Sequence, residues 1–215
     1  MKKNIFFVPE RILIIAPHPD DEILGCGGTI IKAIKNKSKV AVLYLTSGDN
    51  ENVIREKEAE KVCNYLKINK YYFLRLQGRL KLSGKNINKI IKILDDFKPD
   101  FIFINHSRDG DSDHKISYRL TIEASWKYSS ISQKNKLKGI LLYEVHTPMN
   151  EYHIVEDISN LIDEKIKIMA FYKSQIKKSR LDLAIKGLNR YRGTIHEGLD
   201  FAEVFKTKKL FSLFS

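Results

Sequence analysis

The sequence predicts an α/β fold in which a mostly parallel sheet carries helices on both faces. Two observations lead to this fold class. Short apolar runs alternate along the chain with longer stretches whose apolar residues recur at helical spacing. Polar clusters also follow the first, second and fourth apolar runs, as loops do at the carboxyl ends of parallel strands. Repeated strand–helix–strand units favour a parallel sheet because each crossover returns the chain in the same direction.

The first predicted strand is Ile12–Ala16, a short apolar run that ends at a proline-rich polar segment. The second, Val40–Leu45, ends in the polar sequence Thr46–Asp49. Runs of this length and composition are typical of buried strands in α/β proteins. Three further runs are predicted strands: Tyr71–Leu76, Phe101–Ile104 and Gly139–Val145.

The stretches between the strands are predicted helices. Asn86–Phe97 shows the pattern most clearly, because Ile87, Ile90 and Leu94 share one helical face and the stretch stops before Pro99. The other predicted helices are Thr29–Asn36, Arg55–Leu66, Lys115–Tyr128, Ile158–Tyr172 and, at the C-terminal end, Gly198–Phe205. A basic tail, Lys206–Ser215, is expected to be mobile.

Length and composition predict one domain spanning residues 1–215, with 43% hydrophobic and 30% charged residues. No apolar run approaches the roughly 18 residues that span a bilayer, and Ile5–Val8 is too short for a signal peptide. Cys26 and Cys63 lie far apart, which favours free thiols. We therefore expect a cytoplasmic protein.

The net charge of +12 raises the question of a nucleic-acid partner. The lysines are scattered along the predicted helices, however, as expected for solvated faces. The sequence therefore predicts no nucleic-acid partner and no membrane span, and it leaves open a homo-oligomer.

Two polar clusters, each directly after a predicted strand, indicate a metal site. Residues 16–22 read Ala-Pro-His-Pro-Asp-Asp-Glu, and residues 109–114 read Asp-Gly-Asp-Ser-Asp-His. The loops after parallel strands converge at one edge of the sheet. His18, Asp21 and His114 would then supply two imidazoles and a carboxylate, which suit Zn²⁺ with an open position for water, although another divalent metal would also fit.

The neighbouring carboxylates have separate expected roles. Asp20 lies next to a ligand and is expected to act as general base. Glu22 is expected to orient the loop or to interact with the helix dipole, a supporting role behind the metal ligands. A pair of aspartates before a helix is also a common helix cap. The glycines at positions 25, 27 and 28 do not form a dinucleotide-binding motif, because the spacing differs and the preceding acids would repel a pyrophosphate.

Residues 17–22 together with Gly25-x-Gly27-Gly28-Thr29 resemble the signature of the LmbE-like (PIG-L) N-acetylglucosaminyl deacetylase family. Weaker matches follow in the family's order. They are Arg55-x-x-Glu58, residues 143–148, residues 157–159, Lys165, Tyr172-Lys173-Ser174-Gln175, Tyr191-Arg192-Gly193 and residues 201–205. The resemblance implies a Rossmann-like fold, zinc held by His18, Asp21 and His114, Asp20 as base, and hydrolysis of an N-acetyl group from a glucosamine-containing substrate. It also implies that Arg55 binds substrate, although Arg55 could instead pair with Glu58 or Glu51.

One position departs from the family's second motif, which commonly reads His-x-Asp-His. Asp111 stands where the first histidine is expected, and an ionised aspartate would repel an oxyanion. Either Asp111 itself acts as the acid, or another imidazole replaces the missing one. His146 is the first substitute because it follows the fifth strand, and His106 and His196 are the others. Asp113 is expected to orient His114 or Asp20 through hydrogen bonds.

The sequence thus predicts a zinc-dependent enzyme that removes acetyl from an N-acetylamino sugar conjugate. Arg55 and Arg108 are the expected substrate-binding residues, and with Arg79 and Arg192 they favour an anionic conjugate. The arginines could equally pair with nearby acids such as Glu58, Asp109 and Glu197. Two alternatives remain: a metal- or sugar-binding member of the fold that has lost turnover, and a basic nucleotide-binding α/β module. The sequence identifies neither the sugar nor its aglycone.

Overall fold

The structure is a computed structural model that describes residues 9–48, 52–76, 79–131 and 137–210. Its strands form one sheet in the order β3-β2-β1-β4-β5-β7-β6. All pairings from β3 to β5 are parallel, and β7 runs antiparallel to both β5 and β6. The predicted, mostly parallel α/β sheet is therefore confirmed. The strands are β1 (Arg11–Ala16), β2 (Lys39–Tyr44), β3 (Lys70–Phe73), β4 (Phe101–Asn105), β5 (Gly139–Tyr143), β6 (Ile154–Asp157) and β7 (Ala202–Leu210).

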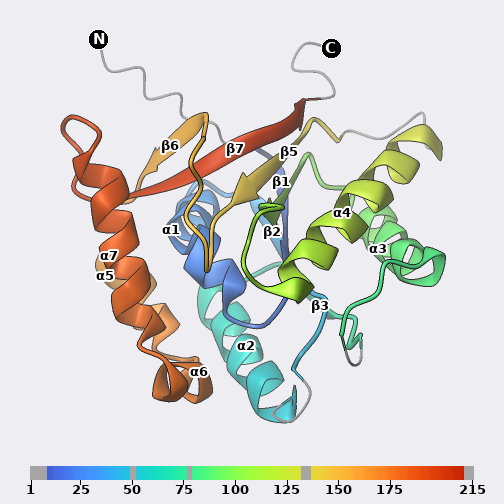
Figure 1. Cartoon of the computed structure of the whole chain (residues 1–215), viewed down its shortest axis with the longest axis horizontal. Coiled ribbons are helices and arrows are strands. Elements are labelled where there is room, and N and C mark those ends of the chain that lie inside the picture. The colour runs from blue at the N-terminus through green and yellow to red at the C-terminus, as the bar shows by residue number, and fades with distance from the viewer. Residues whose placement is uncertain (1–8, 49–51, 77–78, 132–136, 211–215) are drawn as a thin grey trace.

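Helices cover both faces of this sheet (Figure 1). On one face lie α3 and α4, and on the other lie α1, α2 and the group α5 to α7. Within the described residues, none of these helices is long and apolar enough to cross a membrane. The helices are α1 (Asp21–Lys35), α2 (Asn52–Leu66), α3 (Gly84–Phe97), α4 (Ser112–Ile131), α5 (Ile162–Met169), α6 (Lys173–Lys178) and α7 (Leu181–Thr194).

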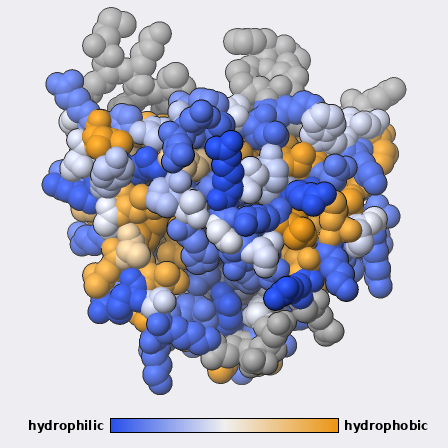
Figure 2. Space-filling model, viewed as in Figure 1, coloured by the Kyte–Doolittle hydropathy of each residue, from blue (hydrophilic) through white to orange (hydrophobic). Residues whose placement is uncertain are grey.

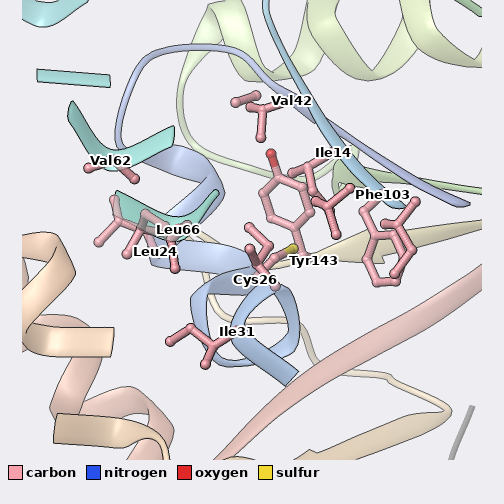
Figure 3. Close-up of a cluster of buried hydrophobic side chains, with 14 of the residues drawn as sticks. Ile14, Leu24, Cys26, Ile31, Val42, Val62, Leu66, Phe103 and Tyr143 are labelled. Atoms are coloured by element: carbon pink, nitrogen blue, oxygen red, sulfur yellow. The ribbon is translucent and has the colours of Figure 1, made fainter. Parts of the chain in front are cut away.

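Each face of the sheet has its own apolar core. Successive residues of β1 alternate between the two, so that Ile12 and Ile14 belong to one core and Leu13 and Ile15 to the other. The residues labelled in Figure 3 come from α1, α2, β1, β2, β4 and β5, and their side chains meet in the first core. Both faces of β1 are buried, which explains its unbroken apolar sequence. Hydrophilic residues occupy much of the molecular face seen in Figure 2.

The glycine-rich stretch lies inside α1, which corrects the expected helix start at Thr29. Contact with neighbouring side chains explains two of the glycines. A Cβ at Gly25 would come within 2.2 Å of the Tyr143 ring, and one at Gly28 within 2.4 Å of Ile158. These glycines therefore let α1 approach the sheet and the Ile158 turn closely, and they do not form a phosphate-binding turn.

The C-terminal third departs most from expectation. The segment Gly198–Phe205 is not a helix, because β7 begins at Ala202 and occupies its second half. The expected mobile tail is also wrong up to residue 210, where β7 ends; residues 211–215 lie outside the described part. β6 and α7 were not expected, and the predicted Ile158–Tyr172 helix is shorter as α5. Residues 202–205 of β7 are all buried, so they lack the alternation that marks a strand.

Candidate metal centre and active site

The loop after β1 carries the first half of the site. His18 and Asp21 lie close together, with His18 Nδ1 3.4 Å from Asp21 Oδ2. The backbone N–H of His18 also donates to Asp21 Oδ2 at 2.9 Å, which holds the turn closed. Asp21 is the first residue of α1 and is 1% exposed. The short loop between β1 and α1 therefore places an imidazole and a buried carboxylate side by side.

The second half comes from the start of α4, beyond β4. His114 is fully buried, and its Nε2 lies 3.2 Å from Asp21 Oδ2. The rings of His18 and His114 lie 5.4 Å apart, centroid to centroid. One ligand atom from each of His18, Asp21 and His114 lies within 4.8 Å of the others. The structure thus brings together the three residues that the sequence predicts as metal ligands.

These residues fit a divalent metal. Both ring nitrogens of His114 are buried, and neither makes a hydrogen bond of good geometry to the described residues. A buried imidazole without partners is costly unless another group satisfies it. Two imidazoles and a carboxylate form a donor set that zinc and similar divalent ions accept. The orphaned nitrogens of His114 are therefore the observation that supports a metal here.

The electrostatics of the three residues are tightly linked. Burial lowers the pKa of His114, but the carboxylates of Asp21 and Asp109 outweigh it and raise that pKa to about 11. Burial opposes the same effect at His18, whose pKa is raised to about 9 by Asp113 and Asp21. Burial would raise the pKa of Asp21, yet the two imidazoles hold it well below its usual range. Without a metal, the imidazoles therefore carry protons at neutral pH.

Asp20, the expected base, has a strained backbone. Its φ of 113° and ψ of −29° lie in a region that side-chain-bearing residues rarely adopt, at a cost of about 1–3 kcal/mol. Arg55 Nη2 donates to Pro19 O at 2.8 Å and lies 3.3 Å from Asp20 Oδ1. The N–H of Asp20 donates to Glu22 Oε2 at 3.1 Å. Burial and the charge of Asp21 raise the pKa of Asp20 well above its usual range, while Arg55 opposes them.

Arg55 therefore has a different neighbour from those expected. Of the two acids predicted as partners, Glu58 instead accepts from Ser174, and Glu51 lies outside the described residues. The Nε of Arg55 is buried and has no hydrogen-bond partner within the described part of the chain. Glu22 contacts the same loop through its Oε2, which accepts the Asp20 N–H; its supporting role stays a prediction.

Asp109 is a site residue that sequence reasoning missed. It is fully buried, and its Oδ2 lies 3.4 Å from His114 Nδ1. The same oxygen accepts from His146 N at 3.2 Å, and Oδ1 accepts from Asp111 N at 3.2 Å. A carboxylate behind a ligand imidazole sets the ring's tautomer and orientation. The signal was present, because Asp109 opens the polar cluster that follows β4.

The two candidates for the acid differ in their surroundings. Asp111 Oδ1 accepts from the N–H groups of Asp113 at 2.7 Å and His114 at 3.3 Å, so this carboxylate caps the start of α4. The exposed His146 ring lies 4.9 Å from the His114 ring, centroid to centroid. His106 bonds through Nε2 to Thr147 O, leaving it poorly placed to serve as acid.

Of the two remaining predicted residues, Asp113 contacts the candidate site and His196 contacts a tyrosine outside it. His196 Nε2 lies 2.9 Å from Tyr152 Oη, so it also has a structural partner. Asp113 does not orient His114 or Asp20 directly; its Oδ2 lies 3.4 Å from His18 Nε2 and its Oδ1 accepts from Leu80 N. Asp113 therefore contacts His18 of the three-residue group rather than His114.

Of the four arginines expected to attract an anion, two are held in ion pairs, Arg55 with Asp20 and Arg192 with Glu144. Arg192 is buried in a paired interaction with Glu144, at 3.0 Å and 2.8 Å, rather than in the substrate region. Arg108 is exposed in the loop between β4 and α4. The pKa of Glu151 is lowered chiefly by its hydrogen bond from Lys206 and to a lesser extent by the charge of Arg108. Arg79 is also exposed. Asp49, which ends the loop after β2, lies outside the described residues.

The chain is similar to known proteins at the level of family and fold. The family model described as "PIG-L: GlcNAc-PI de-N-acetylase" matches residues 13–125. A Bacillus subtilis protein named as a probable N-acetyl-alpha-D-glucosaminyl L-malate deacetylase is 24% identical over 186 residues, covering 77% of this chain and 83% of that one. The diacetylchitobiose deacetylase of Thermococcus kodakarensis is 24% identical over 200 residues, covering 81% and 73%.

Two further matches show how far the similarity extends. A conserved protein of known structure from Thermus thermophilus has a TM-score of 0.79 at 26% identity, covering 97% of this chain and 98% of that one. A glucosamine-6-phosphate deaminase-like protein of Bacteroides thetaiotaomicron matches at 41% identity over 51 residues, and the match spans only 8% of its length. The family model covers both halves of the metal site and more than half of the chain. The chain therefore belongs to the PIG-L (LmbE-like) family.

Proposed function

We propose that this protein is a metal-dependent deacetylase that removes the N-acetyl group from an amino sugar conjugate. The observation that carries the proposal is the group His18, Asp21 and His114, in which Asp21 and His114 are buried and His18 is partly exposed, with Asp20 beside it. The two relatives with the longer matches are named as a probable N-acetyl-alpha-D-glucosaminyl L-malate deacetylase and a diacetylchitobiose deacetylase, and these names support the same reaction class. Zinc is the metal that this donor set suits best, and another divalent ion would fit the same ligands.

The residues of the chain divide the work of amide hydrolysis. A divalent ion held by His18, Asp21 and His114 would polarise the amide carbonyl and acidify the attacking water. Asp20 is the base that accepts the proton of that water, and Arg55 holds its carboxylate in place. Asp109 keeps the His114 ring oriented from behind.

His146 is the residue that we assign as the acid. Its ring is exposed, lies beside His114, and can reach a substrate that approaches from solvent. It would give a proton to the departing sugar amine, because an amine leaves poorly as an anion. The cap that Asp111 makes at α4 occupies one of its oxygens, which supports His146 over Asp111.

The substrate is proposed to be a small N-acetylated sugar conjugate. Arg108 is the exposed guanidinium beside the site that would favour an anionic group on this conjugate. The pairing of Arg55 with Asp20 and of Arg192 with Glu144 leaves fewer arginines for that purpose. Matched neutral and phosphorylated N-acetylglucosamine conjugates, compared at low and high salt, separate the two classes. Arg108→Ala should lower the turnover of the phosphorylated compound alone.

The test of the proposed function is acetate release by the metal-loaded protein. Asp20→Asn should keep the metal and lose about 10²–10⁴-fold in turnover, whereas His18→Ala and His114→Ala should lose the metal itself. His146→Ala should lower turnover with the metal retained, and His153→Ala serves as a control histidine. Full metal content in both ligand variants would contradict the site. If Asp111→Asn reproduces the effect expected of His146→Ala, the acid is Asp111.

A member of the family that binds metal or sugar without turnover is the second candidate. The observation behind it is the replacement of the motif histidine by the helix-capping Asp111. Such a protein would bind one divalent ion per chain and release no acetate from any conjugate. Restoring the histidine with Asp111→His would then be expected to create activity rather than to impair it.

A further inference from the structure

The strained backbone of Asp20 depends on support from the C-terminal part of the chain. Glu22 is 1% exposed, and its two oxygens serve different partners. Oε2 accepts the N–H of Asp20, and Oε1 accepts the hydroxyl of Tyr172, which lies between α5 and α6. A carboxylate held at both oxygens has one orientation, so the hydroxyl of Tyr172 determines where Glu22 presents its acceptor to Asp20.

Tyr172 is itself held in place. Its side chain is fully buried in the first core, and its hydroxyl lies 3.5 Å from that of Tyr44. Two residues further on, Ser174 donates to Glu58 from its backbone N–H at 2.9 Å and from its hydroxyl at 2.6 Å. Glu58 belongs to α2, which anchors the segment that carries Tyr172.

The two charged residues of the Arg55-x-x-Glu58 motif are therefore both connected to Asp20, one directly and one through other residues. Arg55 contacts Pro19 O and Asp20 Oδ1 directly. Glu58 reaches Asp20 through Ser174, Tyr172 and Glu22. Because Arg55 and Glu58 of α2 are both connected to this loop, we expect α2 to help Asp20 keep its strained, positive-φ backbone conformation.

We propose that Tyr172 is a positioning residue for the reaction: it orients Glu22, and Glu22 holds the backbone of Asp20 so that its carboxylate faces the reacting water. Within the described residues, the hydroxyl of Tyr172 lies within hydrogen-bond distance of Tyr44 and Glu22, and of none of the three proposed metal ligands. A tyrosine that served only to fill the core would not need its hydroxyl. The catalytic part of this inference rests on the proposed deacetylase function, and the structural part does not.

The experiment compares Tyr172→Phe with the wild-type protein in two measurements. Removal of the hydroxyl should lower kcat about tenfold, because small displacements of a catalytic group are costly, while KM and metal affinity stay within about twofold. Hydrogen exchange at the Asp20 amide should accelerate at least tenfold, whereas exchange in β1 stays unchanged. Tyr128→Phe, which alters a buried tyrosine in the other core, should change neither quantity.

A double-variant cycle tests whether Tyr172 acts through Glu22. Glu22→Ala should lower kcat more than Tyr172→Phe does, and adding Tyr172→Phe to it should cause no further loss. Glu22→Gln keeps an oxygen for the Asp20 N–H, so it should retain most of the activity. Losses that multiply in the double variant, or unchanged kcat and unchanged Asp20 exchange in Tyr172→Phe, would overturn the inference. If the wild-type protein releases no acetate, the proposed function fails. The hydrogen-exchange measurement still tests whether Tyr172 stabilises the backbone of Asp20 through Glu22.

Discussion

At the scale of single residues, the site is defined by how buried polar groups are satisfied. His114 is enclosed by Asp21 on one side and Asp109 on the other, yet neither nitrogen makes a hydrogen bond of good geometry. The grouping of His18, Asp21 and His114 was predictable from residue type and from their place after strands. Asp109 was not predicted, because its role depends on a side-chain direction that the order of residues does not reveal.

Asp109→Asn is expected to weaken metal binding about 10–100-fold. The amide would present either a donor or a weaker acceptor to His114 Nδ1, so the ring would lose its orienting charge. Titration with Zn²⁺ against a competing chelator measures the effect. Asp100→Asn is the matched control, since Asp100 is a buried carboxylate at the opposite end of β4 that accepts from Arg11 N. Equal losses in both variants would show a general effect of removing a buried charge.

Metal affinity should rise with pH between about 6 and 9. The pKa of His18 is raised to about 9 and that of His114 to about 11 in the metal-free protein, so protons must leave both rings before the metal binds. Lower pH adds protons and therefore opposes binding. Calorimetric titration in buffers of different ionisation enthalpy should show about two protons released per metal at pH 7. Release of none would contradict these protonation states.

At the scale of elements, hydrophobic periodicity predicted one helix well, whereas the start of α1 is explained by its close contact with a neighbouring side chain. The helix of residues 84–97 was predictable from its apolar face, and the structure begins it only two residues before the expected start. The start of α1 was misplaced because glycines usually mark turns. In this protein they mark the contact of a helix with Tyr143, whose hydroxyl donates to Ile15 O and whose ring cannot move aside freely.

Gly25→Ala is expected to lower the free energy of unfolding by about 1–3 kcal/mol, because the new methyl group would overlap the Tyr143 ring. Gly187→Ala provides a control of opposite sign. Gly187 lies within α7 with no atom within 4 Å of an added Cβ, so alanine there should stabilise the protein by up to about 1 kcal/mol. Urea denaturation measures both. A destabilising Gly187→Ala would show that helix propensity does not control this position.

At the scale of the whole molecule, the site residues lie together at the carboxyl ends of the parallel strands, and the C-terminal region packs against the helix that carries Asp21. Convergence of the loops after β1 and β4 followed from parallel topology and was predictable. The support was not, because Lys165 and Glu203 look like surface charges in the sequence, whereas the structure buries both. Lys165 Nζ donates to Leu24 O and to Glu203 Oε1, each at 2.8 Å. The expectation of a single domain over residues 1–215 stays a prediction.

Lys165→Met is expected to lower the free energy of unfolding by about 3–5 kcal/mol, because it leaves the charge of the buried Glu203 carboxylate without its cationic partner. Pairing it with Glu203→Gln should recover part of this loss. The exposed pair of Lys186 and Asp163 offers a comparison, and Lys186→Met should stay within about 0.5 kcal/mol of the wild type. Chemical denaturation with a two-state fit gives all three values. Similar effects for Lys165 and Lys186 would remove the distinction between buried and exposed pairs.

The position of β7 has a consequence for how the chain acquires its shape during synthesis. This strand is the last described element, yet it lies between β5 and β6 in the sheet. Among the described residues, β6 pairs with no other strand. The backbone N–H groups of Gly28 and Thr29 in α1 donate to Glu203 of β7. We expect a growing chain to assemble β1 to β5 and both metal loops first. The pairing of β6 in the sheet and the contacts of α1 with Glu203 would then form only after residues 202–210 have left the ribosome.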